Sequence, residues 1–128
     1  MSMGTRIPYE YRDANNYKRR DYFHLSGELS PEQVQRLIAS LDQWQGGGEQ
    51  VGHFVAQQLG LQHLGYGEWS SFPNENDDHT WHELWLGEIE RVHVVGAAYD
   101  PEEFVAMFEA AKATGWDDSK TVTDWDQS

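Results

Sequence analysis

Cysteine is absent from this chain of 128 residues. Disulfide bonds, zinc sites built on thiolates and catalysis by a thiol are therefore excluded. The chain also lacks an uninterrupted apolar run of about 18 residues, the length that a membrane-spanning helix needs. Its first residues do not have the pattern of a signal peptide. We expect a cytoplasmic protein with no membrane partner.

Positively charged residues are few. The chain has nine lysines and arginines against 22 aspartates and glutamates, which gives a formal net charge of −13. Direct binding to nucleic acid is not expected, because contacts to phosphates need a basic surface. The acidity is typical of a soluble protein, and it also fits an acidic inhibitor that mimics the charge of DNA and binds a host defence complex.

Motifs of common enzyme classes are missing as well. The sequence has no Gly-x-Ser-x-Gly elbow, no Walker loop and no Gly-x-Gly-x-x-Gly fingerprint. Its 22 acidic residues allow many carboxylate pairs, so no single pair indicates a glycosidase. We predict that the protein is not an enzyme and that it carries no cofactor.

The most informative stretch is basic and aromatic, and it spans residues 9–20. Five of the nine basic residues lie among the first twenty positions, with only two acidic residues beside them. Tyrosines alternate with these cations at Tyr9, Tyr11 and Tyr17, a mixture that can stack a base and hold a phosphate. The same cations could instead pair with the protein's own carboxylates, and the sequence does not choose between these interpretations.

Alternation of apolar and polar residues predicts two strands near the start of the chain. The Asp-Ala-Asn-Asn segment at 13–16 is favourable for the turn between them. We expect the strands at residues 7–11 and 17–25, after an irregular start at residues 1–6.

Two capping signals predict helices. Ser30 and Gln33 form a capping box around a proline, and a helix should run from there to the glycines at 46–48. Asp100 precedes a second proline and begins a helix that should end at Gly115.

The remaining segments have weaker patterns. A shorter helix is expected at residues 49–60, followed by a long loop at 60–80. The apolar segments 81–86 and 89–95 should form a strand pair, or one bent strand around Gly87, in the centre of the sheet.

This order of elements predicts an α+β fold, a small antiparallel sheet with two or three helices packed on one face. Residues 1–115 should form a single domain. Residues 116–128 contain several aspartates and no repeating apolar pattern, so we expect a flexible acidic tail.

A second conspicuous stretch contains two histidines. His79, His82 and Glu83 are residue types that bind zinc, so a metal-dependent hydrolase is an alternative hypothesis. Their order does not match the helical zinc-protease motifs. On a strand, His79 and His82 would also face opposite ways. We therefore predict no metal site.

The segment Tyr11–Lys18, with the pattern Tyr-Arg-Asp-x-x-Asn-Tyr-Lys, and the later segment Asp78–Leu84 resemble the phage anti-Thoeris family of small proteins. The resemblance implies a non-catalytic protein that sequesters a signalling nucleotide, a cyclic ADP-ribose isomer or a cyclic oligonucleotide, and so blocks bacterial anti-phage immunity. It also implies a homo-oligomer in the host cytoplasm that binds the nucleotide between protomers.

The family's roles are carried over only at the matching positions. They assign Arg12 and Lys18 to phosphates and Asn16 to a polar edge of the ligand, with Tyr17 beside them. They assign Trp81 and His82 to a stacking or hydrogen-bonding wall. The strong acidity and the tryptophans near the end of this chain depart from the family's pattern and leave the identity of the nucleotide open.

Overall fold

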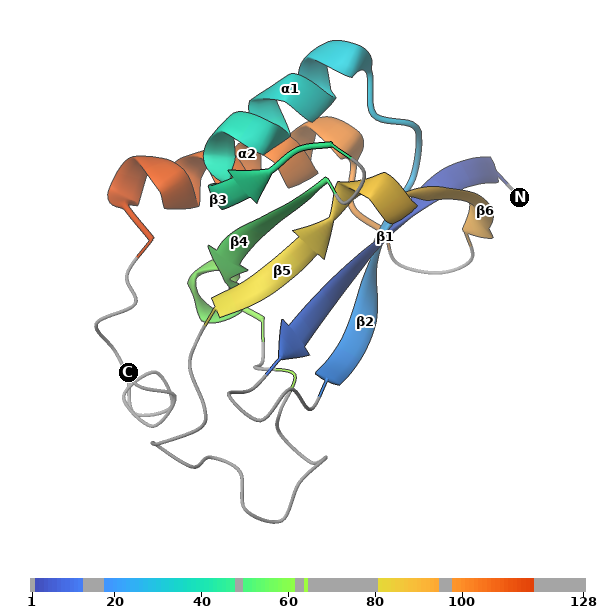
Figure 1. Ribbon diagram of the computed structural model, residues 1–128. Helices are drawn as coiled ribbons and strands as arrows, with labels where there is room; N and C mark the ends of the chain where they lie inside the picture. Colours follow the sequence, from blue (N-terminus) through green and yellow to red (C-terminus); the bar gives the residue numbers. More distant parts are fainter. Residues whose placement is uncertain are drawn as a thin grey trace.

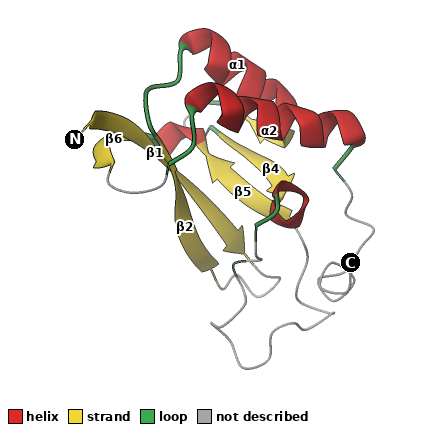
Figure 2. Ribbon diagram, turned by 180° about the vertical axis from the view of Figure 1, so that it is seen from behind, coloured by secondary structure: helices red, strands yellow, loops and turns green. Residues whose placement is uncertain are grey.

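A computed structural model describes residues 2–12, 18–47, 50–61, 64, 81–94 and 98–116. These residues form a six-stranded antiparallel sheet and two α-helices. Both helices lie on the same face of the sheet (Figure 1, Figure 2). The predicted α+β architecture, an antiparallel sheet with helices on one face, is confirmed.

The longest strand, β1 (Ser2–Arg12), organises the sheet. It pairs with β2 (Lys18–Leu25) on one side, and with β5 (Trp81–Trp85) and β6 (Glu90–Val94) on the other. The strands β5 and β6 are separated by a single 3-10 turn, η2 (Leu86–Glu88). Both predicted segments are therefore strands; β5 lies between β1 and β4 in the sheet, and β6 lies off this path and pairs with β1.

The prediction of an irregular start at residues 1–6 is wrong for the described positions. Residues 2–6 pair with β6, from Ser2 opposite Val94 to Arg6 opposite Glu90. Serine and glycine in this segment have little intrinsic preference for a strand. The strand forms because β6, which comes much later in the sequence, provides partners for its backbone hydrogen bonds.

The first helix, α1 (Pro31–Ser40), begins at the predicted capping box. The Ser30 hydroxyl accepts a hydrogen bond from the Gln33 backbone at 3.1 Å, and the Gln33 side chain accepts one from the Ser30 backbone at 2.9 Å. The helix ends at Ser40, short of the glycines at 46–48. A short strand, β3 (Asp42–Gln45), takes the remainder of the predicted helix.

The helix predicted at residues 49–60 is wrong. This segment contains β4 (Val51–Val55) and then a 3-10 turn, η1 (Ala56–Leu59), which Gly60 ends in a left-handed conformation with φ 81°. The strand is covered on both faces, so Val51, Phe54 and Val55 are all buried. A strand buried on both faces has no period-two pattern, and its sequence is easily taken for a helix.

The second helix, α2 (Pro101–Thr114), has the predicted bounds. The Asp100 carboxylate accepts hydrogen bonds from the backbone of Glu102 at 3.0 Å and Glu103 at 3.2 Å, and Gly115 ends the helix with φ 100°. Its buried side chains join the sheet in one core that is rich in aromatics. The aromatic members of that core are Tyr9, Phe23, Phe54, Phe104 and Phe108.

An arginine joins the two helices. The Arg36 guanidinium contacts both carboxylate oxygens of Glu102, at 2.8 and 2.7 Å, and both of Glu109, at 3.1 and 2.6 Å. These hydrogen bonds lower the pKa of Glu102 to about 2 and hold the pKa of Glu109 below its ordinary value. The contacts join α1 to α2.

Replacement of Arg36 by glutamine is expected to remove stability that depends on pH. Both glutamates have a folded pKa below the unfolded one, so their stabilisation is complete above pH 5 and disappears as the pH falls towards 2. Urea unfolding between pH 7 and pH 2 should show the wild type and the variant converging as the pH falls. Arg91→Gln, which removes one exposed ion pair with Glu28, is the control. A constant difference between wild type and Arg36→Gln would contradict this assignment.

Candidate functional site

The basic and aromatic stretch divides between the two faces of the sheet. Successive side chains of a strand point to opposite faces. Tyr9 and Tyr11 point towards the helices, where they are 6% and 0% exposed, so they belong to the core and do not form an exposed stacking platform. Arg12 points to the other face, which we call the outer face.

A pocket of about 230 Å³ lies on the outer face, and we call it the Arg12 pocket. Residues from four different strands line it, because β1, β5, β4 and β3 are consecutive neighbours in the sheet. Glu83 of β5 lies opposite both Glu10 of β1 and His53 of β4, so their side chains share this face. The lining residues are Arg12, Gln43, His53, Trp81 and Glu83.

The cations near this pocket pair with the protein's own carboxylates. The Arg12 guanidinium lies 3.4 Å from Glu10 and 3.8 Å from Glu83. Arg20 lies 3.6 Å from Glu10 and forms a 3.0 Å hydrogen bond with Glu88. Cations and acids alternate around this pocket, so the charges of Arg12 and Arg20 are partly neutralised there.

Glu83 and His53 form the polar wall of the Arg12 pocket. The His53 Nε2 atom lies 3.6 Å from the Glu83 carboxylate. Burial raises the pKa of Glu83, but the contact with His53 and the charge of Arg12 outweigh it, so the pKa of this carboxyl lies below its ordinary value. Among the described residues, His53 Nδ1 and Glu83 Oε1 are buried atoms with no hydrogen-bond partner. Such atoms are suited to bind a polar ligand.

Trp81 and His82 do not form one wall. They are neighbours on β5 and therefore point to opposite faces. Trp81 lines the Arg12 pocket, with its ring 6.4 Å from the His53 ring and nearly perpendicular to it. His82 is fully buried beside Tyr11, and its Nε2 accepts a hydrogen bond from the Leu64 backbone at 3.3 Å. The assignment of His82 to a ligand is corrected: it is a core residue.

The same alternation bears on the metal hypothesis. His82 lies on the helix side of the sheet and Glu83 on the outer face, so these two side chains cannot hold one ion between them. His79 lies outside the described residues. Within the described ranges, no three histidine or acidic side chains converge as a group able to hold a metal ion.

The remaining predicted positions are less defined. Lys18 begins β2 directly opposite Arg12, so it shares the outer face, and it is exposed. Asn16 and Tyr17 lie outside the described residues. The structure therefore brings together Arg12, Trp81 and Lys18 on one face and removes His82 from it.

Sequence reasoning missed His53 and Gln43. His53 lies in a segment expected to be helical, so nothing in the pattern placed it beside Arg12. Gln43 lies in β3, where it has the left-handed φ of 48° in an irregular part of the pairing with β4. Glu83 was considered only as a metal ligand. A correct assignment of the strands would have indicated all three residues, because side chains that lie opposite each other on neighbouring strands point to the same face of the sheet.

Two further observations bear on function. Neither helix in the described residues is long and apolar enough to cross a membrane. The resemblance to the anti-Thoeris family rests on the two sequence segments given above. Comparison of the chain with protein-family models, with curated proteins and with solved structures gave no match.

Proposed function

We propose that this protein is a non-catalytic binding protein that sequesters a signalling nucleotide, a cyclic ADP-ribose isomer or a cyclic oligonucleotide. Sequestration would block bacterial anti-phage immunity in the cytoplasm of the host cell. One observation carries the proposal: Arg12 and Trp81, chosen from two separate sequence segments, line the same pocket. A cation beside an indole ring is a common arrangement in nucleotide recognition.

Each side of the Arg12 pocket fits a different part of a nucleotide. The Trp81 ring offers a stacking surface, which contributes on the order of 1 to 3 kcal/mol per base. Arg12 and Lys18 lie on the same face and are suited to phosphate oxygens. Glu83 and His53 present buried polar atoms that could bond ribose hydroxyls or a base amino group.

The carboxylates around Arg12 restrict the charge of the ligand. Glu10 and Glu83 both lie within 4 Å of the guanidinium and lower the positive potential there. A polyanion such as DNA would be repelled by these carboxylates and by the net charge of −13. A small ligand that combines a base, hydroxyls and few phosphates suits the pocket better.

The size of the pocket supports a shared site. Its volume of about 230 Å³ is below the range of roughly 300 to 1,000 Å³ that encloses most small ligands. The described part of one copy would enclose only part of a nucleotide. We infer that a second copy completes the site in a homo-oligomer. Sequestration itself needs affinity and abundance, and it needs no turnover.

Calorimetric titration tests this proposal with a panel of cyclic ADP-ribose isomers and cyclic dinucleotides. We expect one of them to bind, and mass spectrometry after heat release to recover it intact. Trp81→Ala and Lys18→Ala should each weaken binding by about tenfold or more, which corresponds to 1.4 kcal/mol. Light scattering on the same samples should report an oligomer.

The control variant is Arg91→Ala, which removes an exposed cation outside the pocket and should bind as the wild type does. Arg12→Ala is less decisive, because it also removes a partner of the buried Glu10. Unchanged affinity in both Trp81→Ala and Lys18→Ala would overturn the site. A protein that binds nothing in the panel would favour the acidic inhibitor of a protein complex.

A further inference from the structure

The strand β2 has a free edge. It is the first strand in the order β2-β1-β5-β4-β3. Among the described residues, neither Figure 1 nor Figure 2 shows a strand or helix beyond it. Only the C-terminal end of β2 is covered. There the Tyr99 N–H donates to the His24 carbonyl at 2.9 Å, and the Ser26 N–H donates to the Tyr99 carbonyl at 2.8 Å. Among the residues that the structure describes, nothing pairs with the edge of β2 before His24.

The bonds to Tyr99 show which backbone groups face outwards. The His24 carbonyl accepts from Tyr99, so His24 occupies a position of β2 whose N–H and C=O point away from β1. Tyr22, two residues earlier, has the same orientation. Its N–H donates to the Asp21 carboxylate at 2.8 Å. The Tyr22 carbonyl and the His24 N–H thus lie next to each other as an acceptor and a donor on the free edge.

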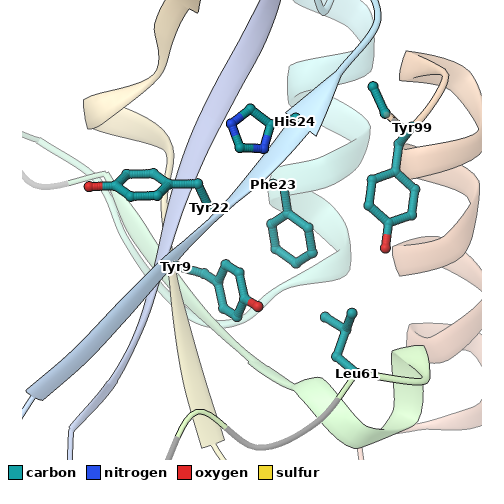
Figure 3. A pocket seen from close by; sticks show the side chains of 7 residues that line it. Tyr9, Tyr22, Phe23, His24, Leu61 and Tyr99 are labelled. Atoms are coloured by element: carbon teal, nitrogen blue, oxygen red, sulfur yellow. The ribbon is translucent and has the colours of Figure 1, made fainter. Parts of the chain in front are cut away.

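A pocket of about 360 Å³ adjoins this edge, and we call it the Tyr9 pocket. In Figure 3, Tyr9, Phe23, Tyr99 and Leu61 gather on one side of β2, while the rings of Tyr22 and His24 lie on the other side. Tyr22 and His24 therefore border the pocket with their backbone atoms. The Tyr9 ring stacks on Phe23 at 4.4 Å, and Tyr99 meets Phe23 edge-on at 6.0 Å.

The described lining of the Tyr9 pocket is aromatic and aliphatic and contains no carboxylate, lysine or arginine. Burial, with smaller effects from Asp21 and Tyr99, raises the pKa of Tyr9 to about 12, so its hydroxyl stays neutral at physiological pH. The aromatic contacts and the backbone bonds of Tyr99 keep the walls fixed. These walls suit an uncharged side chain with a large apolar area, such as an aromatic ring.

The open part of the edge is positively charged on a strongly acidic protein. Lys18 and Arg19 are exposed, Arg20 follows them, and Asp21 is the only acidic residue of β2. Two copies of β2 side by side would bring these cations together, which disfavours pairing of the edge with itself. An acidic strand would be attracted instead.

We propose that the free edge of β2 and the Tyr9 pocket form a docking site for an extended acidic segment of another protein. The segment adds to the sheet as a strand, bonds to the Tyr22 carbonyl and the His24 N–H, and places an aromatic side chain in the Tyr9 pocket. The Tyr9 pocket lies on the helix side of the sheet and the Arg12 pocket on the outer face, and of the residues named for the two sites only Lys18 belongs to both.

The test uses two fluorescently labelled peptides, Phe-Glu-Thr-Glu-Thr-Glu and the same sequence in reverse order, with blocked ends. The two orders cover antiparallel and parallel addition. Their phenylalanine lies on the opposite strand face from the glutamates, so the ring can enter the pocket while the acids face Lys18 and Arg20. We expect one order to bind in a fluorescence polarisation titration and to shift the NMR amide signals of Tyr22 and His24.

Matched controls separate the parts of the site. Replacing the phenylalanine of the peptide by serine, or its glutamates by lysines, should each weaken binding by about tenfold or more. In the protein, Ala98→Trp should fill the pocket and Lys18→Glu should reverse charge on the face of β2 that meets the glutamates, with the same loss. Circular dichroism shows whether each variant folds, and Arg91→Glu, on β6 at the other side of β1, is the control for net charge.

Three results would overturn the proposal. One is no binding by either peptide at millimolar concentration. Another is equal binding of the serine peptide, which would leave the pocket without a role. The third is light scattering that shows two copies joined through β2, because the edge would then belong to a dimer. None of these results bears on nucleotide binding at Trp81.

Discussion

Replacement of Phe108 by alanine is expected to lower the free energy of unfolding by about 3 to 5 kcal/mol. The side chain is fully buried on α2, in the layer between the helices and the sheet. Its ring lies 5.2 Å from Phe54 of β4, 5.0 Å from Phe104 and 6.0 Å from Phe23 of β2. Alanine would leave a cavity that three rigid rings from different elements cannot close.

Urea unfolding followed by circular dichroism measures the effect. Phe108→Leu is the control, because it keeps most of the buried volume and should cost less than about 1.5 kcal/mol. The folded fraction of Phe108→Ala should keep the affinity of the Arg12 pocket, which lies on the opposite face of the sheet. A loss below 1.5 kcal/mol for Phe108→Ala would mean that α2 is not fixed by this aromatic core.

Local chemistry predicted the helix starts, because a cap is decided by residues within one turn. Ser30 with Gln33, and Asp100 with its proline, begin helices where the sequence places them. Gly115 ends α2 for the same reason, since its positive φ of 100° favours glycine. The fold class followed from these elements and from the alternating strands.

Segments whose structure depends on distant partners could not be predicted. Residues 42–45 continue a helical pattern, but they pair with β4. Residues 51–55 are apolar on both faces, so their pattern does not distinguish a helix from a buried strand. The first half of β1 is a strand only because β6 lies beside it. In each case tertiary pairing overrides local propensity.

The candidate site was predicted in part for the same reason. Arg12 was chosen as part of the basic and aromatic stretch and Trp81 through the family resemblance, and the sheet brings both to one pocket. The pairing of Trp81 with His82 was wrong, although the rule that separates them was available in the sequence: adjacent strand residues face opposite ways. That rule was applied to His79 and His82 but not to the two neighbours.

The two faces of β1 explain why one stretch contributes to two different pockets. Tyr9 points towards the helices and lines the pocket at the edge of β2, while Arg12 points outwards and lines the pocket beside Trp81. The mixture of tyrosines and cations is therefore sorted by strand alternation. Within β1, the tyrosines lie on the helix side and Arg12 lies on the outer face.

Replacement of Gly52 by alanine is expected to lower the free energy of unfolding by about 2 to 3 kcal/mol. Gly52 is buried in β4 opposite Leu84, under the end of α1. A Cβ atom at this position would lie 2.7 Å from Leu41 Cβ and 2.8 Å from Leu41 Cδ1. The first of these atoms is fixed to the backbone, so a change of rotamer cannot relieve the contact and the end of α1 must move.

Gly27→Ala is the matched control for Gly52→Ala, because its Cβ would meet Pro101 Cγ at 3.5 Å, an ordinary contact. That substitution should be neutral or slightly stabilising, since alanine restricts the unfolded chain. Thermal and urea unfolding of both variants measure the difference. If Gly52→Ala were as stable as Gly27→Ala, the end of α1 would not pack on β4 as closely as 2.7 Å requires. The short connection from α1 into β3 would then be loose, and with it the placement of Gln43 in the Arg12 pocket.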